Sequence, residues 1–308
     1  MTKRIIVSAA NEGYYPLLSD LISSIEDGKG DADVAIGVLD VGLSGAQRAA
    51  LSARVQHVVA PDWDYRFSAS GSTPQKFRAM TARPHLPKHF PGYDIIMWMD
   101  ADAWIQQWSA VEHFFTQAAS RGLAVCQEMD RSYGNVYNLN NSRQLFFASL
   151  KAFGDEALQH VAWMPMINSG VFAMRADCHY WSEWRDILGG AIQRGHLDHF
   201  TEQTALNVCV YRRLPLPCFM PARFNWVCVH AIPMFDERTQ LYVEPTAPHD
   251  AVSVVHLAGV QTRIQNFGGV SDLTGNKTRM NLMYCQWKEY RDQVRSSGTG
   301  ATQPQPQS

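Results

Sequence analysis

A run of apolar residues that ends in two carboxylates constrains the fold of this chain more than any other feature. Residues 94–99 follow a Pro-Gly-Tyr turn and lead directly into Asp100 and Asp102. Such a run between turn signals is typical of a buried central strand in a parallel sheet. Side chains two residues apart on an extended chain point the same way, so the two carboxylates are predicted to converge.

Converging carboxylates repel each other unless a cation or hydrogen-bond donors lie between them. A hard divalent ion that bridges to a phosphate satisfies this requirement. The alternative is a strand that ends in a solvated acidic turn, and an Asp-x-Asp triplet alone does not separate the two. The remaining motifs have to decide.

Composition narrows the class of protein. The 308 residues are 46% hydrophobic, which is enough for one large core or two smaller ones. The net charge is −2 and like charges form no block, which argues against a nucleic-acid binder. No stretch approaches the roughly 18 apolar residues of a membrane helix, and the first apolar run is too short for a signal peptide. Six cysteines without C-x-x-C spacing indicate reduced thiols, so we expect a cytoplasmic globular protein.

Alternating strands and helices over the first 127 residues predict an α/β layer with a mostly parallel sheet flanked by helices. The predicted strands are 4–10, 34–39, 55–59, 94–99 and 123–126, and the predicted helices are 16–26, 44–54, 74–82 and 109–120. Ser44 and Ser109 are predicted to cap their helices, and Pro84 and Pro87 are predicted to end the helix at 74–82.

The second half is less regular. The pattern predicts a loop at 135–141, a strand at 170–174, a β-rich stretch up to His256, and helices at 142–152, 179–189, 201–211 and 278–294. No linker divides the body, so residues 1–295 are expected to form one domain with a smaller irregular region in its second half. The tail 296–308 has almost no apolar content and is predicted to be disordered.

The end of the first predicted strand has the composition of a ligand-binding edge. Ala9, Ala10, Asn11 and Tyr14 lie there, and open α/β sheets bind ligands at the carboxyl ends of their strands. Small residues let a base approach the backbone, while the amide can bond its edge and the tyrosine can stack on it. The alternative is an ordinary strand-to-helix loop. No G-x-G-x-x-G follows this strand, so a dinucleotide-binding domain is not expected.

Three later segments also place polar groups at element ends. Asn168-Ser169-Gly170-Val171 would enter a strand through a turn of small residues, or be a plain turn. Glu202 and Gln203 open the helix predicted at 201–211, whose acidic first turn is equally typical of any helix start. His256 ends a buried strand just before Gly259, and a single histidine is more often structural than a ligand.

In this order, the segments resemble the retaining glycosyltransferases of family 8, the galactosyl-, glucosyl- and glycogenin-type enzymes with a GT-A fold. The matching positions are Ala9-Ala10-Asn11 with Tyr14, Asp100 with Asp102, Asn168-Ser169-Gly170-Val171, Glu202-Gln203 with Leu206-Asn207, and His256 with Gly259. The resemblance implies a GT-A-type, Rossmann-like sheet with a nucleotide-binding half over about 1–127 and an acceptor-side half over about 128–295.

The resemblance also implies an activity. A hexosyltransferase of this kind moves a sugar, with retention, from a nucleotide diphosphate sugar such as a UDP-hexose to the hydroxyl of a saccharide or glycoconjugate acceptor. Bacterial polysaccharide, lipopolysaccharide or glycoconjugate synthesis would be the setting, with peripheral membrane association left open. Asp100, Asp102 and His256 would hold a metal ion, and the nitrogen ligand shifts the expected ion from Mg²⁺ towards Mn²⁺.

Roles follow residue by residue. The catalytic candidates are Glu202, Gln203 and Asn168, with Glu202 facing the anomeric carbon from the side opposite the leaving group. The candidates for binding the nucleotide sugar are Ala9, Ala10, Asn11, Tyr14, Lys76, Arg83, Asp100, Ala101, Gly170, Gly259 and Arg263. Arg83 has the better spacing for the basic residue that precedes the Asp pair, and Lys76 is the alternative.

This chain departs from the family pattern at three places. Asn11 and Glu202 each replace an aspartate, and Gln261-Thr262-Arg263 stands where the family has Lys-Pro-Trp. A shift of one residue would give Arg263 the diphosphate-binding role of that lysine.

Two other function classes remain open. A metal-dependent phosphohydrolase would use the Asp pair as nucleophile, but such enzymes put it after the first strand and follow it with Thr, whereas Ala103 and Trp104 follow it here. A non-catalytic sugar-binding module would require a lost metal ligand, and all three are present.

Overall fold

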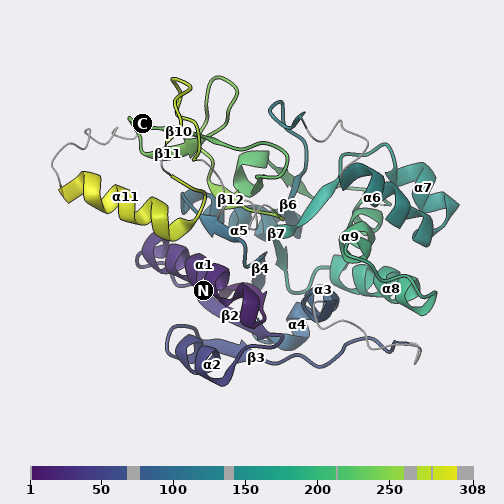
Figure 1. Ribbon diagram of the computed structural model, residues 1–308. Coiled ribbons are helices and arrows are strands. Elements are labelled where there is room, and N and C mark those ends of the chain that lie inside the picture. The colour runs from purple at the N-terminus through teal and green to yellow at the C-terminus, as the bar shows by residue number, and fades with distance from the viewer. Residues whose placement is uncertain are drawn as a thin grey trace.

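The computed structural model describes residues 2–67, 77–134, 142–212, 214–259, 269–278 and 280–296. A seven-stranded sheet crosses its centre in the order β3-β2-β1-β4-β7-β6-β8 (Figure 1). Its strands are β1 (Arg4–Ala10), β2 (Ala35–Asp40), β3 (His57–Val59), β4 (Ile95–Met99), β6 (Leu123–Gln127), β7 (Ile167–Arg175) and β8 (Cys218–Met220). β7 is antiparallel to β4 and β6, and the other neighbours are parallel. The predicted mostly parallel α/β sheet is therefore confirmed.

β4 is buried along its whole length because helices cover both faces of the sheet. Ile95, Met97 and Met99 belong to the hydrophobic cluster on one face, and Ile96 and Trp98 to the cluster on the other. A strand with two buried faces needs apolar side chains at every position, which is why this segment has no polar alternation.

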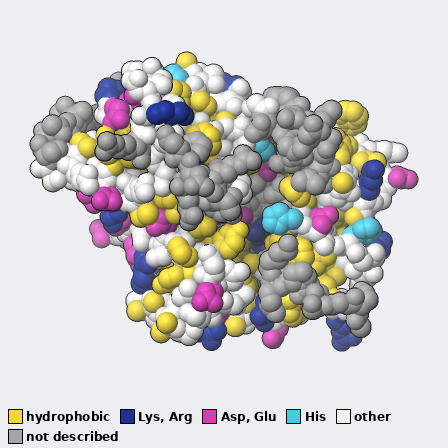
Figure 2. Space-filling view, in the orientation of Figure 1, with side chains coloured by type: hydrophobic (Ala, Val, Ile, Leu, Met, Phe, Trp, Pro, Cys, Tyr) yellow, Lys and Arg dark blue, Asp and Glu magenta, His cyan; other side chains and the backbone are white. Residues whose placement is uncertain are grey.

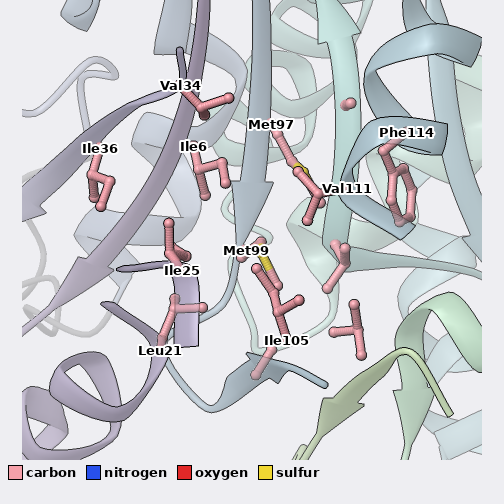
Figure 3. Close-up of a cluster of buried hydrophobic side chains, with 14 of the residues drawn as sticks. Ile6, Leu21, Ile25, Val34, Ile36, Met97, Met99, Ile105, Val111 and Phe114 are labelled. Carbon is pink, nitrogen blue, oxygen red and sulfur yellow. The ribbon is translucent and has the colours of Figure 1, made fainter. Parts of the chain in front are cut away.

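Helices α1 (Tyr15–Lys29) and α5 (Ser109–Arg121) cover the first face. Their apolar side chains meet those of the strands in one cluster (Figure 3), which includes Ile6, Leu21, Ile25, Met97, Val111 and Phe114. Helix α2 (Gly45–Ser52) lies beside β3 at the edge of the sheet.

The second face carries α3 (Phe77–Ala82), α8 (Tyr180–Gln193) and α9 (Thr201–Tyr211). Two further helices, α6 (Ser142–Leu150) and α7 (Asp155–Val161), pack against α9 away from the sheet (Figure 1).

A smaller sheet in the order β5-β12-β9 adjoins the large one. Strand β5 (Ala103–Ile105) starts immediately after the Asp pair, and β12 (Val254–His256) runs antiparallel to it, with His256 opposite Ala103. The other parts of this region are β9 (Trp226–Val227), the pair β10 (Met234–Asp236) and β11 (Leu241–Val243), and α11 (Tyr284–Ser296), which lies beside α1 (Figure 1).

Several predicted boundaries are confirmed and others are wrong. The helix at 201–211 matches α9, and Ser44 forms a capping box at the start of α2. Ser109 does not cap α5, because the helix already begins there and Trp108 precedes it without a side-chain cap. The predicted helix at 278–294 begins only at Tyr284. The predicted loop at 135–141, and residues 297–308 of the predicted tail, lie outside the described residues.

The prolines act differently from the prediction. Helix α3 does end at Ala82, but the chain continues as a 3₁₀ turn (Arg83–His85) and a short helix α4 (Leu86–His89). Pro84 and Pro87 each lie in the first turn of one of these segments, where a missing N–H leaves no hydrogen bond unmade. This restart fixes Arg83 at a helix junction.

Charged side chains of both signs are scattered among apolar ones over the face of the molecule drawn in Figure 2. Within the described ranges, no helix combines the length and the apolar composition needed to cross a membrane.

Close packing against β2 predicts a cost for one added methyl group. A Cβ on Gly37 in β2 would lie 2.6 Å from Phe90 Cε1 and 3.0 Å from Ile5 Cδ1. We expect Gly37→Ala to lower the free energy of unfolding by about 1–3 kcal/mol through overpacking, as measured by urea denaturation. Gly45→Ala is the control, because no atom outside its chain neighbours and its own helix backbone lies within 4 Å of its added Cβ. An unchanged urea midpoint in Gly37→Ala would contradict this packing.

Candidate active site

Asp100, Asp102 and His256 lie together where β4 ends and β5 begins. Asp102 Oδ1 is 3.5 Å from His256 Nε2, and Asp100 Oδ2 is 3.9 Å from the same nitrogen. One ligand atom from each residue lies within 4.8 Å of the others. The structure thus brings together the three residues that the sequence analysis selected as metal ligands.

The physical reason for this convergence differs from the predicted one. Asp100 and Asp102 do not extend β4; they lie in a tight turn in which Ala103 N–H donates to the Asp100 carbonyl at 2.9 Å. The turn leads into β5, and the pairing of β5 with β12 brings His256 alongside. Leu257 N–H also donates to the Asp102 carbonyl at 2.8 Å. The strand alternation that the sequence suggested is therefore wrong as the cause.

Gly170 makes room for the cluster. A Cβ at this position would lie 2.4 Å from His256 Cε1 and 2.8 Å from Asp100 Oδ2. Its carbonyl accepts from Asp100 N–H at 2.7 Å, so backbone and carboxylate approach each other closely. Residues 168–170 lie inside β7, which starts at Ile167, so the predicted entry turn is wrong.

The protonation of the cluster suits a divalent ion. Burial lowers the pKa of His256, but the neighbouring Asp102 and Asp100 carboxylates raise it above its usual value. Burial raises the pKa of Asp102, but contact with His256 lowers it overall. The negative charge that favours a proton on the imidazole also favours a metal ion, which would take the place of that proton. Two carboxylates and one imidazole match the preferences of Mn²⁺ or Mg²⁺.

Arg83 is a buried cation beside this cluster. Its guanidinium donates to Asp100 Oδ1 at 2.7 Å, to Glu202 Oε2 at 2.6 Å and to Ser169 Oγ at 2.8 Å. It also lies over the Trp98 ring, 4.6 Å from the ring centroid. Of the two basic candidates, Arg83 thus lies beside the Asp pair, and Lys76 lies outside the described residues.

Glu202 is almost completely buried at the start of α9, with 1% of its surface exposed. Oε2 accepts from Arg83 and from Ser169 Oγ, whereas Oε1 has no hydrogen-bond partner among the described residues. Burial raises the pKa of Glu202 to about 7, because the loss of solvation and the nearby Asp100 charge outweigh Arg83. The group is therefore poised between its two protonation states near neutral pH.

Gln203 and Asn168 meet at a residue that the sequence analysis missed. Glu128 is buried just beyond β6 and accepts from Asn168 Nδ2 at 2.7 Å and from Gln203 Nε2 at 3.4 Å. His230 Nε2 lies 2.6 Å from its other oxygen. The available signal was its position, because Glu128 comes two residues after the apolar strand predicted at 123–126.

The candidate nucleotide-binding edge lies at the same level as the Asp pair. Val7 pairs with Trp98 across β1 and β4, so residues 9–11 and Asp100 leave the sheet together. Asn11 Oδ1 caps a 3₁₀ turn by accepting from Tyr14 N–H at 3.1 Å, which leaves the amide nitrogen of Asn11 for other contacts. Ala9 and Ala10 end β1, and Tyr14 is 42% exposed.

The other donor-binding candidates are placed only in part. Ala101 is buried in the turn between the two aspartates. Gly259 follows β12 with φ of 78°, a conformation that favours glycine. Arg263 lies outside the described residues.

Comparison with known proteins agrees with this architecture. No family model and no curated protein matches the sequence. A structure of the galactosyltransferase LgtC, in complex with donor and acceptor sugar analogues, matches over 98% of each chain with 17% identity and a TM-score of 0.55. The chain has a GT-A glycosyltransferase fold.

Two further structures extend the comparison. The bifunctional glycosyltransferase WbbM matches over 84% of this chain and 46% of its own, with 14% identity and a TM-score of 0.52. Mouse xyloside xylosyltransferase 1 matches over 83% of this chain and 97% of its own, with 12% identity and a TM-score of 0.50. At these identities the likeness concerns the fold, and the chemistry must be argued from the site.

The raised pKa of Glu202 predicts how stability depends on pH. The folded protein keeps this proton up to about pH 7, whereas an unfolded glutamate releases it near 4.5. The stabilisation is therefore complete below pH 4.5 and is lost as the pH rises through about 7. We expect Glu202→Gln to flatten this part of the stability profile, measured by urea denaturation across the range. Glu289→Gln, at an exposed position, is the control. An identical slope in Glu202→Gln and the parent would refute the assignment.

Proposed function

We propose that this protein is a metal-dependent glycosyltransferase that moves a sugar from a nucleotide diphosphate sugar to an acceptor hydroxyl. The observation that carries the proposal is the cluster of Asp100, Asp102 and His256 beside the buried Arg83. The cluster lies at the carboxyl ends of β1 and β4, and α/β sheets bind their ligands at this edge.

The difficult step is the departure of an anionic diphosphate. Asp100, Asp102 and His256 would hold the divalent ion, Mn²⁺ or Mg²⁺, whose charge offsets that of the leaving group. Arg83 adds a fixed cation that is already held by hydrogen bonds to Asp100 and Glu202. Because these bonds exist before the substrate binds, little reorganisation accompanies the reaction.

Positive charge develops on the anomeric carbon as the leaving group departs. We assign its stabilisation to Glu202, Gln203 and Asn168. Glu202 supplies negative charge from a buried position, and the less buried Gln203 is the neighbour that can touch the sugar. Asn168 is held by Glu128, which also accepts from Gln203.

The finer assignments extend this proposal. The donor is a UDP-hexose bound by Ala9, Ala10, Asn11 and Tyr14, and the acceptor is a saccharide or glycoconjugate of bacterial cell-surface synthesis in the cytoplasm. The reaction retains configuration. Support comes from the sequence motifs and from the fold shared with LgtC, which was crystallised with donor and acceptor sugar analogues.

Ligand-induced stabilisation tests the donor class. We expect nucleoside diphosphates to raise the melting temperature only when Mn²⁺ is present, since the ion bridges protein and diphosphate. A ligand at a hundredfold excess over its dissociation constant adds about 2.7 kcal/mol to stability. Asp102→Asn should abolish the Mn²⁺-dependent part. Asp272→Asn should retain it, because the Asp272 carboxylate accepts from Thr274 and Asn276 N–H and is not part of the cluster. Release of phosphate from monoesters, without nucleoside diphosphate release from sugar nucleotides, would instead identify a phosphohydrolase.

Glu202→Gln tests the catalytic assignment. The substitution removes the charge that favours a cationic transition state, so turnover should fall by an amount equivalent to about 2–4 kcal/mol with donor affinity nearly unchanged. In the parent, turnover should rise with pH as Glu202 ionises, at a pH below about 7 because the bound ion favours the ionised form, and the variant should lack this rise. Steady-state kinetics across pH measures both effects. Normal turnover in Glu202→Gln would return this residue to a structural role.

A further inference from the structure

A single row of hydrogen bonds connects the Asp-Asp-His cluster with a buried pair of side chains, Glu128 and His230. His230 Nε2 lies 2.6 Å from Glu128 Oε2, and Glu128 Oε1 accepts from Asn168 Nδ2 at 2.7 Å. Asn168 Oδ1 accepts from Asn225 Nδ2 at 2.9 Å, and Asn225 Oδ1 lies 2.8 Å from His256 Nδ1. All five side chains are at most 7% exposed.

The direction of each bond follows from groups whose role is unambiguous. The backbone N–H of Gly170 can only donate, and it lies 2.8 Å from one end of the Asn168 amide. That end must be the oxygen, so the nitrogen of Asn168 points towards the Glu128 carboxylate, which accepts. The contacts at the two ends of the amide therefore agree on the orientation of Asn168.

The orientation of Asn168 determines, through Asn225, which nitrogen of His256 carries a proton. Because Asn168 presents its oxygen, Asn225 must present its amide nitrogen to Asn168 and its oxygen to His256. An amide oxygen only accepts, so His256 must carry a proton on Nδ1. Nε2 is then the nitrogen whose lone pair faces Asp100 and Asp102 once the ring is neutral.

We propose that Asn225 and Glu128, with His230 behind them, are positioning residues that lock His256 in the Nδ1–H form and thereby direct Nε2 to the metal ion. This inference rests on the proposed function, because it concerns the same metal site. Glu128 also accepts a hydrogen bond from Gln203 Nε2 at 3.4 Å. One carboxylate therefore orients both the metal ligand His256, through the two asparagines, and Gln203, which we assign to the sugar. Second-sphere partners of this kind set the tautomer and ring orientation of metal-binding histidines.

Burial makes the hydrogen bonds of this row costly to break. A buried donor or acceptor without a partner is costly, so no member can turn without leaving its neighbours unpaired. Sequence patterns did not select Asn225, Glu128 or His230, because their contacts join segments that are far apart in the chain.

A pair of substitutions at Asn225 tests the proposal. Asn225→Leu removes the acceptor, whereas Asn225→Asp keeps an acceptor opposite His256 Nδ1. In the metal-free parent at alkaline pH, where the ring is neutral, ¹⁵N NMR should show His256 protonated on Nδ1. We expect Asn225→Leu to lose this signature and to bind Mn²⁺ about 10- to 100-fold more weakly in calorimetry. Asn225→Asp should keep the signature, because a carboxylate oxygen still accepts from His256 Nδ1, although the variant loses the donor to Asn168.

A remote pair keeps the test valid if Asn225→Leu does not fold. Glu128→Leu touches no metal ligand but should weaken Mn²⁺ binding and shift the His256 tautomer, and Glu128→Gln should restore both because its amide oxygen still accepts from Asn168. Gln127→Leu is the matched control, since Gln127 is the neighbouring residue and bonds Tyr211 Oη instead.

Any of three results would overturn the proposal. The parent could carry the His256 proton on Nε2, the parent could fail to bind Mn²⁺, or the Leu variants could keep both the tautomer and the Mn²⁺ affinity of the parent. A parent that shows the Nδ1–H form and binds Mn²⁺ but transfers no sugar would overturn the proposed function and leave the positioning row in place. The two failures are therefore distinguishable.

Discussion

The burial of Arg83 between two carboxylates is the interaction on which the rest of the site depends. One guanidinium joins Asp100 after β4, Ser169 in β7 and Glu202 in α9. Removing one partner of a buried ion pair leaves an uncompensated charge, which costs about 3–5 kcal/mol. The three elements are thus held in register by a group that none of them supplies, since Arg83 lies at the helix junction after α3.

Strand β7 separates this ionic network from the amide network that reaches His256. Successive side chains of a strand point to opposite faces. Ser169 contacts Arg83 and Glu202, whereas its neighbour Asn168 contacts Glu128 and Asn225, and Gly170 leaves space for His256. Three consecutive residues therefore serve both sides of the site, and each is constrained by a different contact.

Local patterns predicted the parts of the fold that depend on local physics. The apolar run at 94–99 predicted β4, and the segment from Thr201 predicted α9, because burial on both faces and helical periodicity are written in neighbouring residues. The antiparallel direction of β7 and the pairing of β5 with β12 were missed, since both are set by contacts between distant segments.

The residues of the candidate site also fall into two groups, those that sequence motifs indicated and those that only contacts between distant segments revealed. Asp100, Asp102 and His256 were found because motif order ties them to a known fold family, although the argument from strand alternation was wrong. Glu128 and Asn225 are isolated polar residues in sequence, and only their buried contacts reveal them. Asn168 was selected from its motif, but the sequence did not indicate which neighbours orient it.

Charge balance links the two protonation equilibria of the site. Without a metal ion, the raised pKa values of His256 and Glu202 favour an imidazolium and a protonated glutamate, so Asp100 and Asp102 are balanced by Arg83 and His256. With a divalent ion bound as proposed, His256 is neutral and Glu202 is ionised, and the site again has no net charge. The three negative charges of Asp100, Asp102 and Glu202 are then offset by Arg83 and the ion. Metal binding would thus exchange for protons from both groups, because ligands must be deprotonated and a nearby cation lowers the pKa of a carboxylic acid. The negative charge assigned to the cationic transition state would therefore be present mainly when the ion that assists the leaving group is also bound.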